Sequence, residues 1–172
     1  RVVAYFAALT YMLPLSMSIA TLVMVGQAAG AHDWVRARMA VKVSLWLTTS
    51  FAVVLGVGLW VVREPVIALS TGDPAVRAVA LALVFYVCVY QLSDALQTVA
   101  AHALRGYKVT LLPMFLHTLC FWGVGLGGGY WLSYHAGTRV EAPSVAGFWE
   151  ASVLATVLAT VLFGVLLRSV IR

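Results

Sequence analysis

The feature that most constrains this chain is a series of apolar runs, each about as long as a lipid bilayer is thick. A helix needs roughly 20 mostly apolar residues to cross about 30 Å of hydrocarbon. The runs that meet this length are residues 4–29, 43–62, 78–104, 109–134 and 150–168. Charged residues or Gly/Pro clusters bracket each of them, as is usual at span ends. The pattern therefore predicts five transmembrane helices and no separate soluble domain in residues 1–172.

The composition supports the same fold class. Hydrophobic residues make up 63% of the chain and charged residues only 10%, and the mean hydropathy is +0.98. Soluble domains are nearer half apolar and one-quarter charged. In lipid, backbone polar groups must be satisfied inside the protein, and a helix does this within one segment. The runs also lack the short alternation of polar and apolar residues that barrel strands show. We therefore predict an all-α, polytopic integral membrane protein.

The basic residues predict how the chain is oriented, because Lys and Arg favour cytoplasmic loops. One set of span ends carries seven of them: Arg36, Arg38, Lys42, Arg105, Lys108, Arg168 and Arg172. The other set carries four, Arg1, Arg63, Arg77 and Arg139, with the acids Glu64, Asp73, Glu141 and Glu150. This bias predicts an outside N-terminus and a cytoplasmic C-terminus. The net charge of +5 is thus attributed to topology, and no nucleic-acid partner is expected, because no basic run is interleaved with aromatic residues.

Several other features indicate structure and not chemistry. Pro14 lies in the middle of the first run, removes a hydrogen bond to the carbonyl of Thr10, and predicts a helix kink. The glycines at 123, 125 and 128 match the letters of a dinucleotide fingerprint, but no strand precedes them, so they indicate close helix packing or bending. Cys88 and Cys120 fall inside spans, where buried free thiols are expected. The missing initiator Met and the long first run, too long for a signal peptide, suggest a piece of a larger protein.

Asp94 is the exception in this apolar sequence. A charge at mid-membrane costs at least about 2.5–3.5 kcal/mol on insertion scales. On a helix, the polar residues Tyr90, Gln91, Gln97 and Thr98 share its side. Such a stripe is expected to line a water-filled cavity, in which the carboxylate either holds a cation or takes up a proton. The sequence therefore favours a functional ion site at Asp94.

The alternative for Asp94 is a static ion pair with a basic residue of another helix. Arg105 and His102 lie nearer the end of the same span, and no other Lys or Arg falls at mid-membrane. His117, one span later, is a weaker candidate. A lone membrane histidine usually makes an interhelical hydrogen bond, with proton relay as the less favoured role.

An ordered set of short motifs resembles one family. The set comprises Pro14-Leu15-Ser16, Val25-Gly26-Gln27 with Gly30, Asp94-Ala95-Leu96-Gln97, Leu104-Arg105-Gly106-Tyr107-Lys108, Gly125-Leu126 with Gly129-Tyr130, and Gly147-Phe148-Trp149. In order and spacing it resembles the C-terminal half of multidrug and toxic compound extrusion (MATE) transporters, in particular the bacterial NorM-type branch. The resemblance covers essentially the whole chain.

The resemblance implies a fold and an activity. Members have twelve helices in two six-helix lobes and exchange Na⁺ or H⁺ for organic cations and other drugs, so this chain would be helices eight to twelve, with the N-terminal lobe and the seventh helix outside it. It implies that Asp94 and Tyr90 bind the coupling cation and that no cofactor or metal is needed beyond a possible Na⁺ at Asp94. Gln91, Gln97 and Thr98, which share the side of Asp94 by helical spacing, are the candidates to line the cleft. The implied location is the bacterial inner membrane.

Two departures and three alternatives accompany this prediction. The family motif GLPxGY has Pro where this chain has Gly127, and Glu150 replaces a usually apolar residue, which we interpret as marking the outer membrane surface.

One alternative is a lipid-linked precursor flippase of the same superfamily, which would favour a more cationic cleft. An intramembrane enzyme using Asp94 with a histidine is another, but no catalytic residues are predicted because HExxH, GxSxG and paired aspartates are missing. The last is a non-transporting scaffold subunit with Asp94 ion-paired.

Overall fold

The computed structural model describes residues 2–70, 72–135 and 145–171, and every regular element in these ranges is helical. The helices are α1 (Val2–Gly30), α2 (Trp34–Val61), α3 (Arg63–Ser70), α4 (Pro74–Gly106), α5 (Leu111–Thr118), the π-helix η1 (Leu119–Gly128), α6 (Gly129–His135) and α7 (Val145–Ile171). Five helical segments are long and apolar enough to cross a membrane: Met12–Gly30, Trp34–Val61, Val76–Gly106, Leu111–Trp131 and Gly147–Ile171. The predicted all-α fold with five membrane helices is confirmed.

The helices extend beyond the apolar runs that predicted them. The second begins at Trp34 instead of 43, because Asp33 caps it: the backbone N–H of Arg36 donates to the Asp33 carboxylate at 2.9 Å. The last begins at Val145 instead of 150. Hydropathy marks only the part of a helix that suits hydrocarbon, and a capped helix continues through the polar interface.

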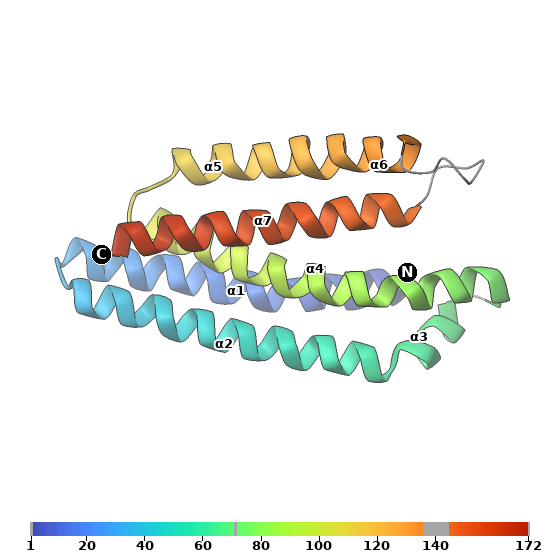
Figure 1. The fold of residues 1–172 in the computed structure, drawn as a ribbon. Helices are drawn as coiled ribbons and strands as arrows, with labels where there is room; N and C mark the ends of the chain where they lie inside the picture. The colour runs from blue at the N-terminus through green and yellow to red at the C-terminus, as the bar shows by residue number, and fades with distance from the viewer. Residues whose placement is uncertain (1, 71, 136–144, 172) are drawn as a thin grey trace.

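The helix α4 lies at the centre of the bundle and packs against α1, α2 and α7. The fourth span, formed by α5, η1 and α6, packs along α7 on the side away from α1 and α2 (Figure 1). A functional group on a side of α4 that faces α1, α2 or α7 therefore contacts protein.

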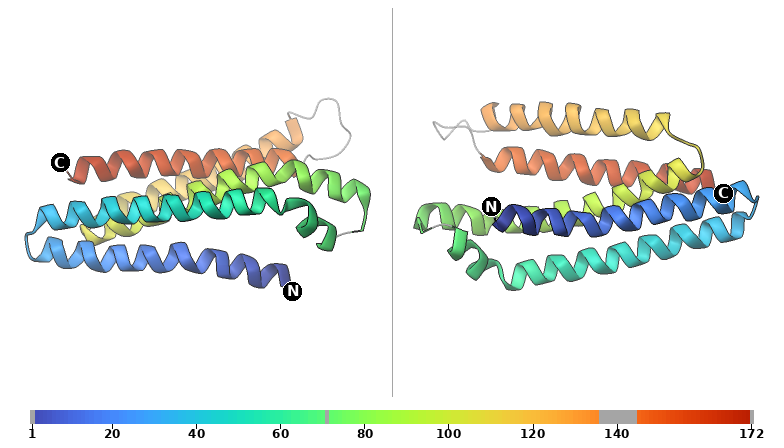
Figure 2. Two further views of the ribbon diagram at one scale, coloured as in Figure 1. Left: turned by 90° about the horizontal axis from the view of Figure 1, so that it is seen from below. Right: turned by 180° about the vertical axis from the view of Figure 1, so that it is seen from behind.

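Most of the described charged residues lie at the two ends of the bundle, and most of the basic ones lie at the same end. The C-terminus, the α1–α2 turn and the α4–α5 connection lie at one end in all views (Figures 1 and 2). The basic residues carried by these segments are Arg36, Arg38, Lys42, Arg105, Lys108 and Arg168. We call this the basic end. Arg63, Glu64, Asp73, Arg77 and Glu150 belong to the segments at the other end. Arg1, Arg139, Glu141 and Arg172, which the sequence assigned to one end or the other, lie outside the described residues. That the basic end is cytoplasmic stays a prediction.

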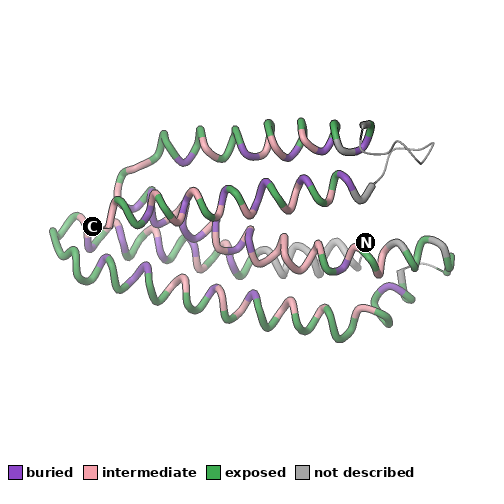
Figure 3. The backbone as a smooth tube through the Cα atoms, in the orientation of Figure 1, coloured by how far each residue is buried: buried purple, intermediate pink, exposed green. Residues whose placement is uncertain are grey.

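Many large apolar side chains point outward, and many of the buried residues are small. Leu69 is 90% exposed and Trp46 76%, and exposed residues follow much of the outer faces of the helices (Figure 3). Lipid tails solvate such side chains as well as protein does, so membrane helices associate through close packing of small residues. Accordingly Ala151, Ala155 and Ala159 are buried at four-residue spacing on α7. A Cβ at Gly125 of η1 would lie 3.5 Å from the Cβ of Ala155, which supports the packing interpretation of this glycine, whereas nothing lies within 4 Å of a Cβ at Gly123.

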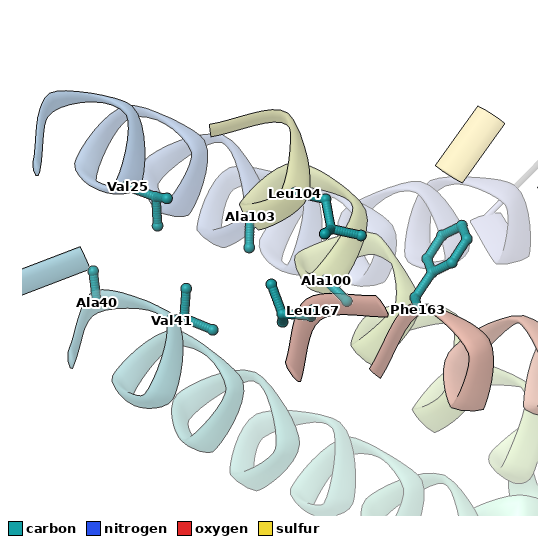
Figure 4. Close-up of a cluster of buried hydrophobic side chains, with 8 residues drawn as sticks. All are labelled: Val25, Ala40, Val41, Ala100, Ala103, Leu104, Phe163 and Leu167. Carbon is teal, nitrogen blue, oxygen red and sulfur yellow. The ribbon is translucent and has the colours of Figure 1, made fainter. Parts of the chain in front are cut away.

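A buried apolar cluster lies where α1, α2, α4 and α7 meet, toward the basic end. It consists of Val25, Ala40, Val41, Ala100, Ala103, Leu104, Phe163 and Leu167 (Figure 4). The cluster fixes the end of α4 next to α1. Pro14 lies inside α1, where its carbonyl accepts a hydrogen bond from the Ser18 hydroxyl at 2.7 Å. The bend that Pro14 predicts in α1 stays a prediction.

The close approach of α1 and α4 at Gly106 gives a test of this packing. A Cβ at Gly106 would lie 2.9 Å from two atoms of the Val25 side chain and 3.1 Å from the Leu22 carbonyl oxygen. We therefore expect Gly106→Ala to destabilise the full-length protein by about 1–3 kcal/mol through overpacking, measured as a lower thermal unfolding midpoint in detergent. Gly164→Ala is the matched control, because nothing lies within 4 Å of a Cβ there. Equal midpoints for the two variants would contradict the close approach.

Candidate functional site

The candidate site is centred on Asp94, which lies in the C-terminal half of α4. Its carboxylate is half-buried and accepts a hydrogen bond from Gln97 Nε2 at 3.0 Å. Gln97 is one helical turn further along α4 and only 3% exposed. The i, i+3 spacing therefore brings the two residues together, as residues on one helix face are expected to be. A neutral amide, and not a cation, is the hydrogen-bond partner of this carboxylate.

No basic residue neutralises Asp94 in the part of the chain that the structure describes. None of the described Lys and Arg residues is paired with it, and the titratable group of another span that acts on it electrostatically is His117 of α5. His102, on α4, uses Nδ1 to contact the carbonyl oxygen of Thr98 at 2.8 Å. The static ion pair considered as an alternative is therefore not formed within these residues.

His117 contacts aromatic rings instead of making the hydrogen bond that was expected of it. Its ring stacks on Phe121, with centroids 4.4 Å apart, and lies 6.4 Å from the ring of Phe163 on α7. Phe163 is buried in the apolar cluster. These contacts hold the imidazole against α7 while leaving the residue exposed. The resulting position places a titratable group on the fourth span close to Asp94.

A pocket of about 280 Å³ opens between α4 and α5. Its lining comprises Gln97, Thr98, Ala101, His102, Arg105, Thr110, Pro113, Met114, His117, Thr118 and Phe163. Two of the predicted polar residues, Gln97 and Thr98, thus line a cavity. Asp94 is not among the lining residues, and its connection to the pocket runs through its hydrogen bond to Gln97.

Tyr90 lies one turn before Asp94 and is directed toward α7. Its ring meets that of Trp149 edge to face, with centroids 6.3 Å apart. Together with Phe148 and Ser152, these rings line a second hollow of about 330 Å³. Gln91, between Tyr90 and Asp94, is half-buried. Tyr90 thus lines one hollow and Gln97 and Thr98 line the other, with Asp94 between them along the helix, and Gln91 lines neither of the two.

Two hydrogen bonds between α4 and α7 were not anticipated from the sequence. The Thr160 hydroxyl shares its hydrogen bond between two backbone oxygens, that of Ser93, next to Asp94, at 2.9 Å and that of Thr156 on its own helix at 2.8 Å. The Tyr86 hydroxyl donates to Glu150 Oε1 at 3.2 Å. A Thr or Tyr inside an apolar span is the only sequence signal for such bonds, and it does not name the partner. They attach α7 to α4 on both sides of Tyr90.

The described residues bring no group of three or more His, Cys, Asp and Glu side chains together in a metal-binding arrangement. A single carboxylate with neutral oxygen groups nearby suits a proton or a hard cation such as Na⁺, which prefers oxygen ligands. In this chain the Asp94 carboxylate supplies one charged oxygen group.

Comparison with known proteins gives consistent matches. The family model described as MatE matches residues 1–131. The chain is 67% identical over all of its 172 residues to a protein of Aromatoleum aromaticum named "Probable multidrug resistance protein NorM", covering 37% of that protein. It is 36% identical over 155 residues, 87% of the chain, to "Multidrug resistance protein PmpM" of Pseudomonas aeruginosa, covering 31% of that protein. The chain thus spans about a third of the length of these relatives.

A solved structure has the same fold. The crystal structure of the eukaryotic MATE transporter AtDTX14 superimposes with a TM-score of 0.80 at 19% sequence identity. The match covers 91% of this chain and 34% of that one. The arrangement of the described helices is therefore that of part of this transporter fold.

The bond between Thr160 and Ser93 gives a test of how the site is held. Thr160→Val keeps the shape of the side chain but removes the donor, and we expect a loss of about 1 kcal/mol in the stability of the full-length protein, as for other interhelical hydrogen bonds in membranes. Thr49→Val is the control, because the Thr49 hydroxyl donates to the carbonyl oxygen of Leu45 in its own helix, at 2.6 Å. Thermal unfolding in detergent compares the two. A larger loss for Thr49→Val would refute the proposed attachment.

Proposed function

The chain belongs to the MATE family of membrane transporters, and from this premise we propose that it is most of the C-terminal lobe of a bacterial multidrug efflux antiporter. The proposal is supported by the share of the relatives' length that the chain covers, by the names of those relatives, and by the fold. On this proposal residues 1–172 are helices eight to twelve. The seventh helix and the N-terminal lobe complete the transporter in the bacterial inner membrane, with the basic end in the cytoplasm.

We assign cation coupling to Asp94, and one observation supports this most strongly. The carboxylate is half-buried in an apolar helix, its hydrogen-bond donor is a neutral amide, and no described Lys or Arg is paired with it. A buried carboxylate without a cation is unfavourable, so a proton or Na⁺ that binds there is stabilised. Tyr90, one turn away, is the second group assigned to this site. The charged partner comes from the seventh helix.

Binding at Asp94 changes the charge of the lobe. An occupied carboxylate is neutral, holds a cationic drug less strongly, and no longer attracts His117. A ligand moves a two-state equilibrium only through its different affinity for the two states. If the outward-open state binds the cation more tightly, each tenfold difference in affinity shifts the equilibrium by about 1.4 kcal/mol. Entry of the cation thus favours release of the drug outside, and the exchange of Na⁺ or H⁺ for organic cations follows.

The described basic residues bear on the flippase alternative. These residues lie near helix ends, at the two ends of the bundle, and not beside Asp94. An anionic lipid-linked headgroup would require cations inside the cleft, whereas an uncompensated carboxylate attracts organic cations. The charge distribution therefore favours efflux of cationic drugs over transfer of an anionic lipid.

The assignment of Asp94 is tested in the full-length transporter, reconstituted into vesicles with imposed Na⁺ or H⁺ gradients. Asp94→Asn keeps the size of the side chain and removes its ability to ionise. We expect gradient-driven drug efflux to fall to the level of protein-free vesicles, while the thermal midpoint stays within a few degrees of the parent protein.

Glu150→Gln is the matched control, because it removes a carboxylate near the other end of the bundle, where Glu150 accepts a bond from Tyr86. We expect this variant to retain most of the gradient-driven efflux. Efflux by Asp94→Asn that still follows the ion gradient would rule out the assignment of coupling to Asp94.

A further inference from the structure

The pocket between α4 and α5 extends from the basic end toward Asp94. Its lining on α4 runs from Arg105, in the last turn, to Gln97. These residues are eight positions apart, which corresponds to about 12 Å along a helix. Asp94 lies three positions further, or about 4.5 Å. The pocket therefore covers most of the depth between the basic end and the carboxylate.

Gln97 forms the inner wall of the pocket and has an unused acceptor. Its Nε2 donates to Asp94, and its Oε1 is buried and has no hydrogen-bond partner among the described residues. A buried amide oxygen without a partner is unfavourable, and ordered water is the usual way in which such groups are satisfied. The unpaired oxygen therefore indicates that water enters the pocket as far as Gln97.

The lining and the size of the pocket also suit water. Hydroxyl, amide and imidazole groups come from both helices, namely Gln97, Thr98, His102, Thr110, His117 and Thr118. A volume of about 280 Å³ holds several water molecules, each of which occupies about 30 Å³ in the liquid. Polar groups therefore stand on both walls of the pocket, among the apolar residues Ala101, Pro113, Met114 and Phe163.

We propose that this pocket is a water-filled passage through which the cation bound at Asp94 leaves toward the basic end of the bundle. The inference depends on the proposed coupling role of Asp94, and it adds the route that the ion takes. Gln97 connects the two, because the residue that donates to the carboxylate is also the inner wall of the passage. The passage runs between α4 and α5, beside Phe163 of α7.

The charged and titratable groups of the passage lie at its rim and on both of its walls. Arg105 lies at the rim on α4, His102 lies on the same helix, and His117 faces them from α5. The fixed positive charge of Arg105 lowers the local concentration of cations at the rim, and it raises the barrier equally for cations that enter and for cations that leave. The direction of release therefore follows from the proposed exchange, in which the cation enters from outside and leaves at the end that we predict to be cytoplasmic.

The passage is tested by the reactivity of introduced thiols toward a water-soluble, membrane-impermeant, cationic methanethiosulfonate. The parent is the full-length transporter with its native cysteines replaced, in inside-out membrane vesicles. Thr98→Cys places a thiol in the pocket. Phe115→Cys is the control on α5, at a side chain that is 59% exposed on the bundle surface and is not part of the pocket lining. We expect Thr98→Cys to react at least ten times faster than Phe115→Cys, and more slowly when the reagent is applied from the opposite side.

A second position protects the test against a folding defect. Thr118→Cys lies on the other wall of the pocket and is used if Thr98→Cys does not fold. If the folded pocket variant reacts no faster than Phe115→Cys, the proposed passage is wrong. A loss of coupling in Asp94→Asn would still stand in that case. Fast modification with unchanged coupling in Asp94→Asn would overturn the coupling role, and with it the passage as an ion route.

Discussion

Hydrogen bonding inside lipid is the constraint on which the rest of this structure depends. Backbone groups are satisfied within the helices, and hydroxyl groups inside the spans mostly donate to the carbonyl oxygen one turn earlier, as Ser18, Thr21 and Thr156 do. This leaves few polar groups that need partners elsewhere. Asp94 and Gln97 are among these few, and each meets part of the other's requirement. The polar character of the site is therefore set by what the apolar surroundings cannot supply.

The contact between α4 and α7 turns this pair into a site with defined surroundings. Thr160 attaches α7 next to Asp94, and Tyr86 attaches it two turns before. The fourth span packs along α7, and the contact of His117 with Phe163 of α7 holds the imidazole near Asp94. Small residues on α7 permit this close approach, and Phe163 of α7 lines the pocket. The position of the pocket thus follows from the packing of α7 on both neighbours.

Much of the fold could be predicted from the sequence, and less of the site could. Apolar length predicts the five spans because lipid thickness sets it, and the pairing of Asp94 with Gln97 follows from helical periodicity. The bonds from Thr160 and Tyr86 could not be predicted, because they depend on how far one helix is displaced along another. The same holds for the π-helix Leu119–Gly128, whose winding depends on contacts with α7 as well as on its glycines. The cation-binding role of Asp94 and Tyr90 is a prediction that the fold alone does not test.

The amide of Gln97 has a consequence of its own. While Asp94 is ionised, only the nitrogen end of the amide can face it, so the oxygen end is directed elsewhere. A protonated carboxyl group can donate as well as accept, and the amide is then free to turn over by half a rotation. Such a turn reverses the sign of the dipole on the far side of Gln97. Water bound to Gln97, three residues along the helix from Asp94, would thus respond to the charge of the carboxylate without contacting it.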